Sequence, residues 1–325
     1  MTLPPYLSPL RYPGGKGALA PFIGRLVSQQ SQRPTTYAEP FAGGAGAALK
    51  LLVDEYVDRV ILNDLDAGIA AFWRSVLRAP DALVHRIRTC KLNIAEWRRQ
   101  RAVYSSHTAT DLELGFATFY LNRTNRSGIL TGRPIGGLKQ QGKWTIDARF
   151  NRQDLATRIQ LIARYRNRIE IEERDGVEFL VDHLKTSDSC LYYVDPPYLS
   201  HGADLYLNTL SWENHQHLSR ILSDASAPWV VTYDLDSRVR DELYPRHRIA
   251  RFRIAHTAAA QHVGEEYAIF SNFLNLDSLA GLGSAGGFAI TPKNRLGEIV
   301  FERPNRNRPF SVTNSSLAQQ LRSRS

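Results

Sequence analysis

The chain has 325 residues, 43% of them hydrophobic, so it can bury a substantial core in one large domain with an insertion or in two domains. Its formal net charge of +9 favours an anionic partner, although charge alone is weak support for nucleic acid. No run approaches the roughly 20 apolar residues of a membrane span, and residues 1–5 lack the pattern of a signal peptide. Cys90 and Cys190 form no CxxC pair, which argues against a disulfide framework or a metal site and fits a reducing cytosol.

The first part of the chain alternates strands and helices after a Gly-Pro loop at residues 11–16. The apolar spacing predicts a helix over 18–27, a strand over 35–38, a helix from the turn at 41–46 to residue 54, a strand over 59–63 and a helix over 66–78. This order contains a βαβ unit, which implies a parallel sheet.

The alternation stops between about residues 80 and 152. Residues 80–122 are predicted to be helical, with an amphipathic stretch at 112–121, and 124–152 are predicted to be irregular because they are rich in glycine, arginine and lysine. Alternation then resumes with a helix over 154–164, a strand over 169–172, a helix over 177–184, a strand over 191–194, a helix over 212–222 and strands over 229–233, 249–254 and 267–273.

These patterns predict one α/β domain, made of residues 1–79 and 153–275, that is interrupted by an inserted domain at 80–152. Residues 276–325 form a polar tail, which carries five arginines and no acid from Arg303 to Ser325. We expect this tail to be partly disordered, and the sequence leaves open whether it contacts DNA phosphates.

The most informative motif follows the predicted strand at 191–194 and reads Asp195, Pro196, Pro197, Tyr198. An acid at the carboxyl end of a buried strand lies where open α/β sheets bind their ligands. The two prolines remove backbone donors, so the carbonyls of Asp195 and Pro196 can point into a cleft, beside the flat ring of Tyr198. Acceptors and a stacking face without a nucleophile suit an exocyclic amino group on an aromatic base, although a Pro-Pro pair after a strand is often only a loop.

A turn of small residues follows the first strand and consists of Glu39, Pro40, Phe41, Ala42, Gly43, Gly44, Ala45 and Gly46. Its glycines allow the backbone to approach a ligand closely. The spacing is neither G-x-G-x-x-G nor a Walker loop, which disfavours a dinucleotide pyrophosphate. The acid at its start, Glu39, suits a ligand that is cationic or zwitterionic at this point.

Two further features support a ligand site. Asp64 ends the second strand, where a carboxylate can accept hydrogen bonds from ribose hydroxyls, although an Asp at this position is also a common helix cap. The loop at 11–16 adds the aromatic ring of Tyr12 and the ammonium group of Lys16.

Together the segments 11–16, 39–46, 63–64 and 195–198 resemble the Dam-like, D12-class DNA adenine-N6 methyltransferases, in which they occur in the same order. The resemblance covers roughly residues 8–275. It implies a Rossmann-like S-adenosylmethionine-dependent fold with a mostly parallel sheet. It also implies a target-recognition region between the cofactor half and the catalytic half, where residues 80–152 lie.

The resemblance assigns roles to individual residues. It implies catalytic roles for Asp195, Pro196, Pro197 and Tyr198. It implies cofactor contacts by Tyr12, Lys16, Asp64, Asp195, the turn residues Glu39, Pro40, Phe41, Gly43, Gly44 and Gly46 at the methionine end, and Asp175 at the adenine end.

The insertion supplies the predicted grip on double-stranded DNA. Its irregular part carries one acid, Asp147, and seven basic residues, namely Arg123, Arg126, Arg133, Lys139, Lys143, Arg149 and Arg152. Such residues can neutralise phosphates and read guanine edges. Residues 121–123 and Gly128 are similar to the family's recognition region. Residues 124–126 depart from the aromatic-rich segment of the GATC-specific members, so GATC is not predicted as the target.

The chemistry of the motif agrees with N6 methylation. The lone pair of adenine N6 is delocalised into the ring, and acceptors at Asp195 and Pro196 would localise it toward a sulfonium methyl group. The target base must leave the duplex, with Tyr198 as its stacking partner. Cytosine-N4 methylation uses the same geometry and stays an alternative, as does a DNA-binding relative without catalysis. RNA or protein-glutamine methylation is disfavoured because Asn usually opens the tetrapeptide in those families.

We therefore expect a cytoplasmic, DNA-associated methyltransferase from a bacterial or phage setting, with no membrane association and no metal. A monomer or weak dimer is expected, and a restriction endonuclease is a candidate partner.

Overall fold

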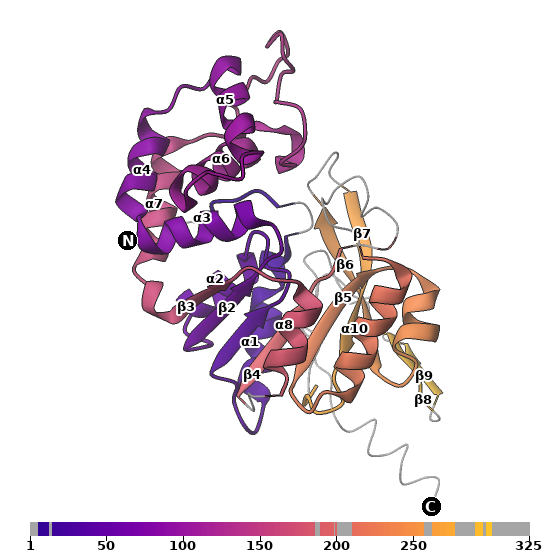
Figure 1. Ribbon diagram of the computed structural model, residues 1–325. Coiled ribbons are helices and arrows are strands. Elements are labelled where there is room, and N and C mark those ends of the chain that lie inside the picture. The colour runs from indigo at the N-terminus through magenta and orange to yellow at the C-terminus, as the bar shows by residue number, and fades with distance from the viewer. Residues whose placement is uncertain are drawn as a thin grey trace, which may run out of the picture.

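The computed structural model describes residues 6–12, 15–185, 189–197, 199, 210–256, 262–276, 290–294 and 297–300. Its centre is a seven-stranded sheet in the order β3-β2-β1-β4-β5-β7-β6 (Figure 1). The strands are β1 (Thr36–Glu39), β2 (Arg59–Asn63), β3 (Ile169–Glu172), β4 (Cys190–Val194), β5 (Trp229–Asp234), β6 (Arg248–His256) and β7 (His262–Phe270). The first five are parallel to one another, and β7 is antiparallel to both of its neighbours.

The strand order reverses between β1 and β4. Thr36 of β1 is paired with Arg59 of β2 on one side and with Cys190 of β4 on the other. In open parallel sheets such a switch point opens a crevice at the carboxyl ends of the two strands, and ligands bind there. Glu39 ends one of these strands, and Asp195 directly follows the other.

Helices cover both faces of the sheet, which explains why β4 is an uninterrupted apolar run. All five β4 residues are buried: Leu191 and Tyr193 belong to one core cluster, and Cys190, Tyr192 and Val194 belong to the other. The helices are η1 (Lys16–Leu19), α1 (Ala20–Gln29), α2 (Gly46–Val53), α3 (Ala67–Arg78), α4 (Pro80–Thr89), α5 (Ile94–Tyr104), α6 (Asp111–Thr124), η2 (Arg126–Gly128), α7 (Arg152–Ala163), η3 (Arg166–Arg168), α8 (Gly176–His183), α10 (Trp212–Asp224) and the π-helix η4 (Val239–Leu243).

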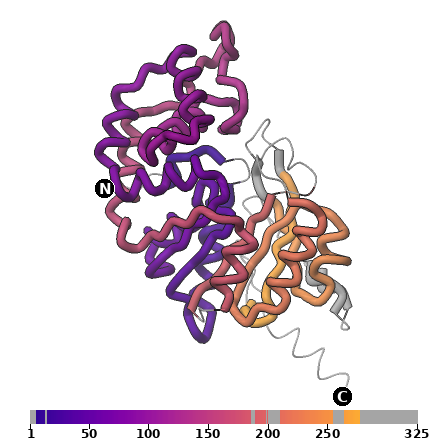
Figure 2. The backbone as a smooth tube through the Cα atoms, viewed as in Figure 1, coloured from indigo at the N-terminus to yellow at the C-terminus, as the bar shows by residue number. Residues whose placement is uncertain are grey.

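The helices between β2 and β3 form a group to one side of the sheet. The trace leaves β2, passes through α3 to α6 and the irregular segment at 125–151, and returns through α7 to β3 (Figure 2). A capping box between Thr110 and Glu113 starts α6. From Gly115 to Thr124 every residue of α6 is buried, so the amphipathic pattern predicted for 112–121 is wrong. The reason is packing: α3 and α5 both lie against α6.

Most predicted elements are confirmed with end shifts of one or two residues. The strand predicted at 267–273 is the largest error, because β7 covers His262–Phe270 and pairs with β6 along its whole length. The described part of the polar tail includes an antiparallel pair of strands, β8 (Ile290–Asn294) and β9 (Gly297–Val300), which the sequence did not predict. Among the described residues, no helix combines the length and the apolar character that crossing a membrane requires.

Candidate active site

Four acidic or hydroxyl side chains meet at the carboxyl edge of the parallel strands. Glu39 ends β1, Asp64 follows β2, Asp195 follows β4, and Thr232 lies inside β5. The first three were predicted as site residues, and each is at the edge where the strand order predicts a ligand crevice.

Glu39 is a buried carboxyl at the start of the glycine turn. Its Oε1 accepts hydrogen bonds from the Tyr37 hydroxyl at 3.1 Å and from the Ala48 backbone N–H at 3.0 Å. Burial raises the pKa of Glu39 to about 8, so the group can change charge near neutral pH. A buried carboxyl of this kind is ready to accept a cationic ligand group, which would favour its ionised form.

The glycine turn and the N-terminal loop pack directly on each other. Gly43 has a φ of +46°, and a Cβ atom added there would lie 2.7 Å from the Tyr12 ring. A Cβ on Gly44 would lie 3.1 Å from Tyr12 Cβ, and a Cβ on Gly46 would lie 3.4 Å from Gly17 Cα. The N-terminal loop and the glycine turn are thus in contact at the edge of the sheet where the strand order predicts a ligand crevice.

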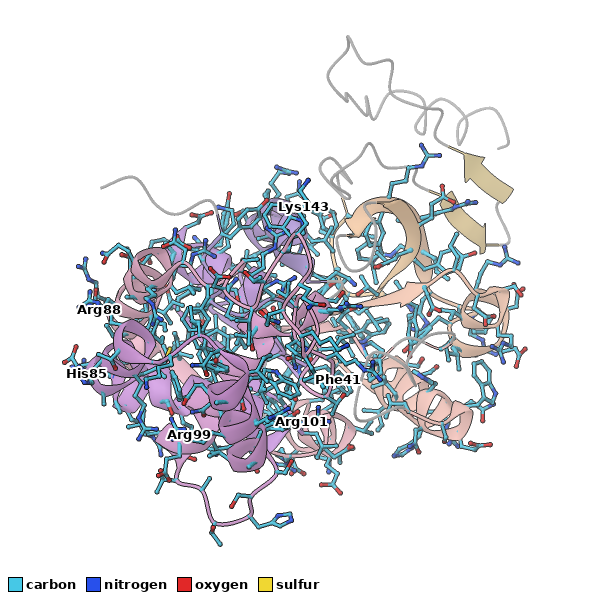
Figure 3. All side chains as sticks on the ribbon, turned by 90° about the horizontal axis from the view of Figure 1, so that it is seen from above. Phe41, His85, Arg88, Arg99, Arg101 and Lys143 are labelled. Atoms are coloured by element: carbon cyan, nitrogen blue, oxygen red, sulfur yellow. The ribbon has the colours of Figure 1, made fainter. Side chains whose placement is uncertain are left out.

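Contacts from neighbouring elements hold the other residues of the turn. The Pro40 carbonyl accepts from the side-chain amide of buried Asn63 at 2.8 Å. The Phe41 ring lies against Gly176 at the start of α8, and Figure 3 labels this ring near the middle of the molecule. The buried indole of Trp73 donates to the Gly43 carbonyl at 2.9 Å. The turn is therefore fixed by β2, α3 and α8 before any ligand binds.

Asp64 ties the end of β2 to the same turn. Its Oδ2 accepts from the Gly43 backbone N–H at 2.8 Å, and its Oδ1 accepts from the Asp66 backbone N–H at 2.9 Å. Burial raises the pKa of Asp64 to about 6. Each carboxylate oxygen has two lone pairs, so both can accept a further hydrogen bond from a ligand hydroxyl.

Neighbouring side chains hold Asp195 through one of its two carboxylate oxygens. Oδ1 accepts from the Thr232 hydroxyl at 2.7 Å and lies 3.2 Å from Lys16 Nζ. The Thr232 oxygen in turn lies 2.9 Å from the Tyr193 hydroxyl. Within the described part of the chain, Oδ2 takes no hydrogen bond, and the side chain is 24% exposed. The arrangement leaves one carboxylate oxygen available to a ligand in the crevice, beside buried Pro196.

Asp175 and Tyr198 were predicted to contact the cofactor and the target base, respectively. Asp175 caps α8, accepting from the Val177 and Glu178 backbone N–H groups at 2.8 and 3.1 Å. It also lines a cleft of about 470 Å³ together with Asn214 and His217. Tyr198 lies outside the described residues.

The basic residues predicted to contact DNA separate into two groups. Five are exposed on the irregular segment, namely Arg126, Arg133, Lys139, Lys143 and Arg149. Exposed apolar side chains accompany them: Leu138 is 55% exposed and Trp144 is 62% exposed. Lys143, which is labelled in Figure 3, has its Nζ 5.8 Å from the Trp144 ring centroid.

The remaining two arginines make hydrogen bonds inside the protein, and their DNA contacts stay predictions. Arg123 is buried, and its Nε donates to the Pro9 carbonyl at 2.7 Å. Burial and the neighbouring charges of Arg158 and Arg11 lower the pKa of Arg123 to about 9. Arg152 donates to the Cys90 carbonyl at 2.7 Å and to the Ile87 carbonyl, and so caps the C-terminal end of α4.

Residues that the sequence analysis did not select complete the site. Thr232 and Glu266 contact Asp195 and Lys16 from β5 and β7. Asn122 binds the backbone of Arg11, accepting from its N–H at 2.7 Å and donating to its carbonyl at 2.7 Å. None of these contacts follows from spacing along the chain, since each joins segments more than 30 residues apart.

The sheet order, with five parallel strands and a reversed hairpin at β7, together with acids at the switch point, defines a Rossmann-like methyltransferase fold. The family model for D12 class N6 adenine-specific DNA methyltransferases matches residues 12–260, and the chain belongs to this family. The enzyme is therefore an adenine-specific, S-adenosylmethionine-dependent methyltransferase, as the motifs predicted.

Solved structures similar to this chain include two RNA methyltransferases. The rRNA methyltransferase AviRa from Streptomyces viridochromogenes is 16% identical, with 78% of this chain and 83% of that chain covered and a TM-score of 0.35. A putative RNA methyltransferase from Pyrococcus horikoshii is 10% identical, with 83% and 86% covered and a TM-score of 0.39. A search of curated proteins found no match.

Proposed function

We propose that the enzyme methylates N6 of an adenine flipped out of double-stranded DNA, with Asp195 as the acceptor that activates the amino group. The observation that carries this proposal is that the two oxygens of the Asp195 carboxylate have different contacts. Thr232 and Lys16 hold Oδ1, while Oδ2 has no hydrogen bond from any described residue. An oriented, open acceptor at a strand end suits an N–H donor on the substrate.

The proposed site of S-adenosylmethionine, which supplies an electrophilic methyl group when bound, is the crevice that the strand order predicts between the ends of β1 and β4. The Tyr12 ring over Gly43 offers a close-packed wall. Asp64 can accept from the ribose hydroxyls, and Glu39 can balance the amino group of the methionine end. Asp175, beside the cleft at α8, is the proposed contact at the adenine end.

The residues around Asp195 can then act on the base. Oδ2 of Asp195 and the carbonyl of Pro196 would accept the two N–H groups of N6 and localise its lone pair. Holding two reactants in line supplies roughly 7–11 kcal/mol of an activation barrier. A carboxylate already fixed by Thr232 needs no reorganisation as positive charge develops on N6. No covalent intermediate with the protein is required.

The irregular segment at 125–151 is the proposed DNA grip. Its exposed lysines and arginines can neutralise backbone phosphates, and exposed Trp144 can stack on or wedge against a base. Tyr198 is the proposed stacking partner of the flipped adenine. A bacterial or phage setting and a partner restriction endonuclease are proposals that rest on the family resemblance alone.

The substitution Asp195→Asn tests the proposal, because it keeps the shape of the side chain and removes the charged acceptor. Loss of one preorganised acceptor typically lowers turnover by about 10²–10³. Methyl transfer to unmethylated plasmid DNA would be measured by mass spectrometry of the nucleosides. The control is Asp236→Asn, at a half-buried carboxylate that is paired with Arg238. Turnover above about a tenth of the wild-type value, or N4-methylcytosine as the product, would contradict the proposal.

A further inference from the structure

Glu266 is a buried carboxylate beside the active site that belongs to none of the sequence motifs. It lies on β7, where Gly264, Glu266, Ala268 and Phe270 alternate onto one face, and it is the ionisable member of that set. Its side chain is 2% exposed. Its oxygens lie 3.2 and 3.3 Å from Lys16 Nζ.

Lys16 therefore bridges two carboxylates. Its ammonium group lies 3.2 Å from Glu266 Oε2 and 3.2 Å from Asp195 Oδ1. Side-chain exposure increases along this line, from 2% at Glu266 through 4% at Lys16 to 24% at Asp195. Glu266 is thus too deep to touch a substrate, but it contacts Lys16, which in turn contacts Asp195.

The charges explain what a second carboxylate does there. A Lys16–Asp195 pair alone would be neutral, and the ammonium would offset the negative charge that Asp195 presents to the crevice. With Glu266 included, the three groups sum to a net charge of −1. Burying a carboxylate costs folding free energy unless the group is paired, so Glu266 would destabilise the fold without Lys16.

We propose that Glu266 is a positioning residue for methyl transfer, which holds Lys16 so that Lys16, Asp195 and Glu266 together keep a net charge of −1 and Asp195 directs Oδ2 to the ligand. This inference rests on the proposed function, in which Asp195 faces both a sulfonium and the positive charge that develops on N6. Three groups that sum to −1 stabilise both positive charges more than a neutral Lys16–Asp195 pair does.

The first test compares two ligands that differ by one charge. S-adenosylmethionine carries a sulfonium, and S-adenosylhomocysteine has a neutral thioether in its place. Calorimetry on the full chain would give the ratio of their affinities. In Glu266→Gln the preference for the sulfonium should fall about tenfold, the scale of one unit charge acting over several ångströms at a partly screened site.

The neighbouring residue provides a matched control. Glu265 lies on the opposite face of the same strand and is paired with Arg251 and Arg253. Glu265→Gln should leave both the ligand ratio and the turnover unchanged. A purely structural role for Glu266 would lower stability without changing the ratio of the two affinities, and that result would overturn the proposal.

A double variant keeps the proposal testable if Glu266→Gln does not fold. Lys16→Met with Glu266→Gln removes one positive and one negative charge, so Asp195 keeps the sum at −1 and no unpaired buried ion is left. The sulfonium preference of this double variant should equal that of the wild type, because the two lost charges cancel. A preference about tenfold above the wild-type value would show that only the ammonium charge matters and would refute the role of Glu266, whereas undiminished methylation by Asp195→Asn would refute the proposed function itself.

Discussion

Replacement of Gly43 by alanine should damage the cofactor crevice more than the same replacement at another glycine of similar backbone conformation. Gly43 has a φ of +46°, and an added Cβ would lie 2.7 Å from the Tyr12 ring. Gly137, in the irregular segment, has a φ of +68°, and an added Cβ there would have no heavy atom within 4 Å. The two positions share the backbone strain and differ in the collision.

The magnitudes follow from these two terms. A left-handed conformation costs an L-residue about 1–2 kcal/mol, and this applies at both positions. Overpacking adds about 1–3 kcal/mol, and this applies at Gly43 alone. Carbon atoms normally approach to about 3.5 Å, so the Tyr12 ring must move by roughly 0.8 Å and would no longer cover the turn in the same way.

Urea unfolding and calorimetric binding of S-adenosylhomocysteine would measure the two effects. Gly137→Ala should lose only the strain term and bind the ligand normally, whereas Gly43→Ala should lose more stability and bind more weakly. Combining Gly43→Ala with Tyr12→Ala should recover at least about 1 kcal/mol of the sum of the single losses, because the collision is removed. Equal losses of stability in the two alanine variants, with unchanged ligand binding, would refute the reasoning.

Three further predictions concern titration, packing and DNA. Burial raises the pKa of Glu39 to about 8, so between about pH 4.5 and pH 8 the folded state holds a proton that the unfolded chain has released. The free energy of unfolding should therefore fall as the pH rises from about 4.5 to about 8. Urea titrations should show that Glu39→Gln flattens this pH dependence. Arg123→Ala should lower the free energy of unfolding by about 1.5–3 kcal/mol, through loss of the bond to Pro9; unchanged stability would contradict its internal role. Lys139→Ala and Lys143→Ala should each weaken DNA binding equally on all sequences and reduce the salt slope by about 0.9 in anisotropy titrations, and an unchanged slope would remove them from the interface.

The parallel part of the fold was predictable because its signals are local. The predicted ends of β2 and β3 match the structure, since each is a short apolar or alternating run followed by polar turn residues. The end of β7 was not predictable in the same way. Its limits depend on pairing with β6 as far as His262↔His256, and such a partner is invisible to a pattern read along one strand.

The candidate site shows the same contrast between residues with a local sequence signal and residues placed by tertiary packing. Glu39, Asp64 and Asp195 were predictable because each follows a strand at the ligand edge of the sheet. Thr232 and Glu266 were not, because they lie within strands and face inward through three-dimensional packing. A count of basic residues also failed to separate exposed Lys143 from buried Arg123, since composition does not reveal the direction of a side chain.

The hydrogen bonds of Asn122 have a consequence for exchanging target specificity between related enzymes. Its side chain holds both backbone groups of Arg11 and also donates to the Gly128 carbonyl at 3.0 Å. Arg11 directly precedes Tyr12, so the entry to the irregular segment and the loop over the glycine turn form one hydrogen-bonded unit. A graft that imports a foreign recognition segment should therefore join after Gly128 and keep residues 122–128 native. A junction placed at the apparent domain boundary near residue 80 would replace half of this clamp and misplace Tyr12.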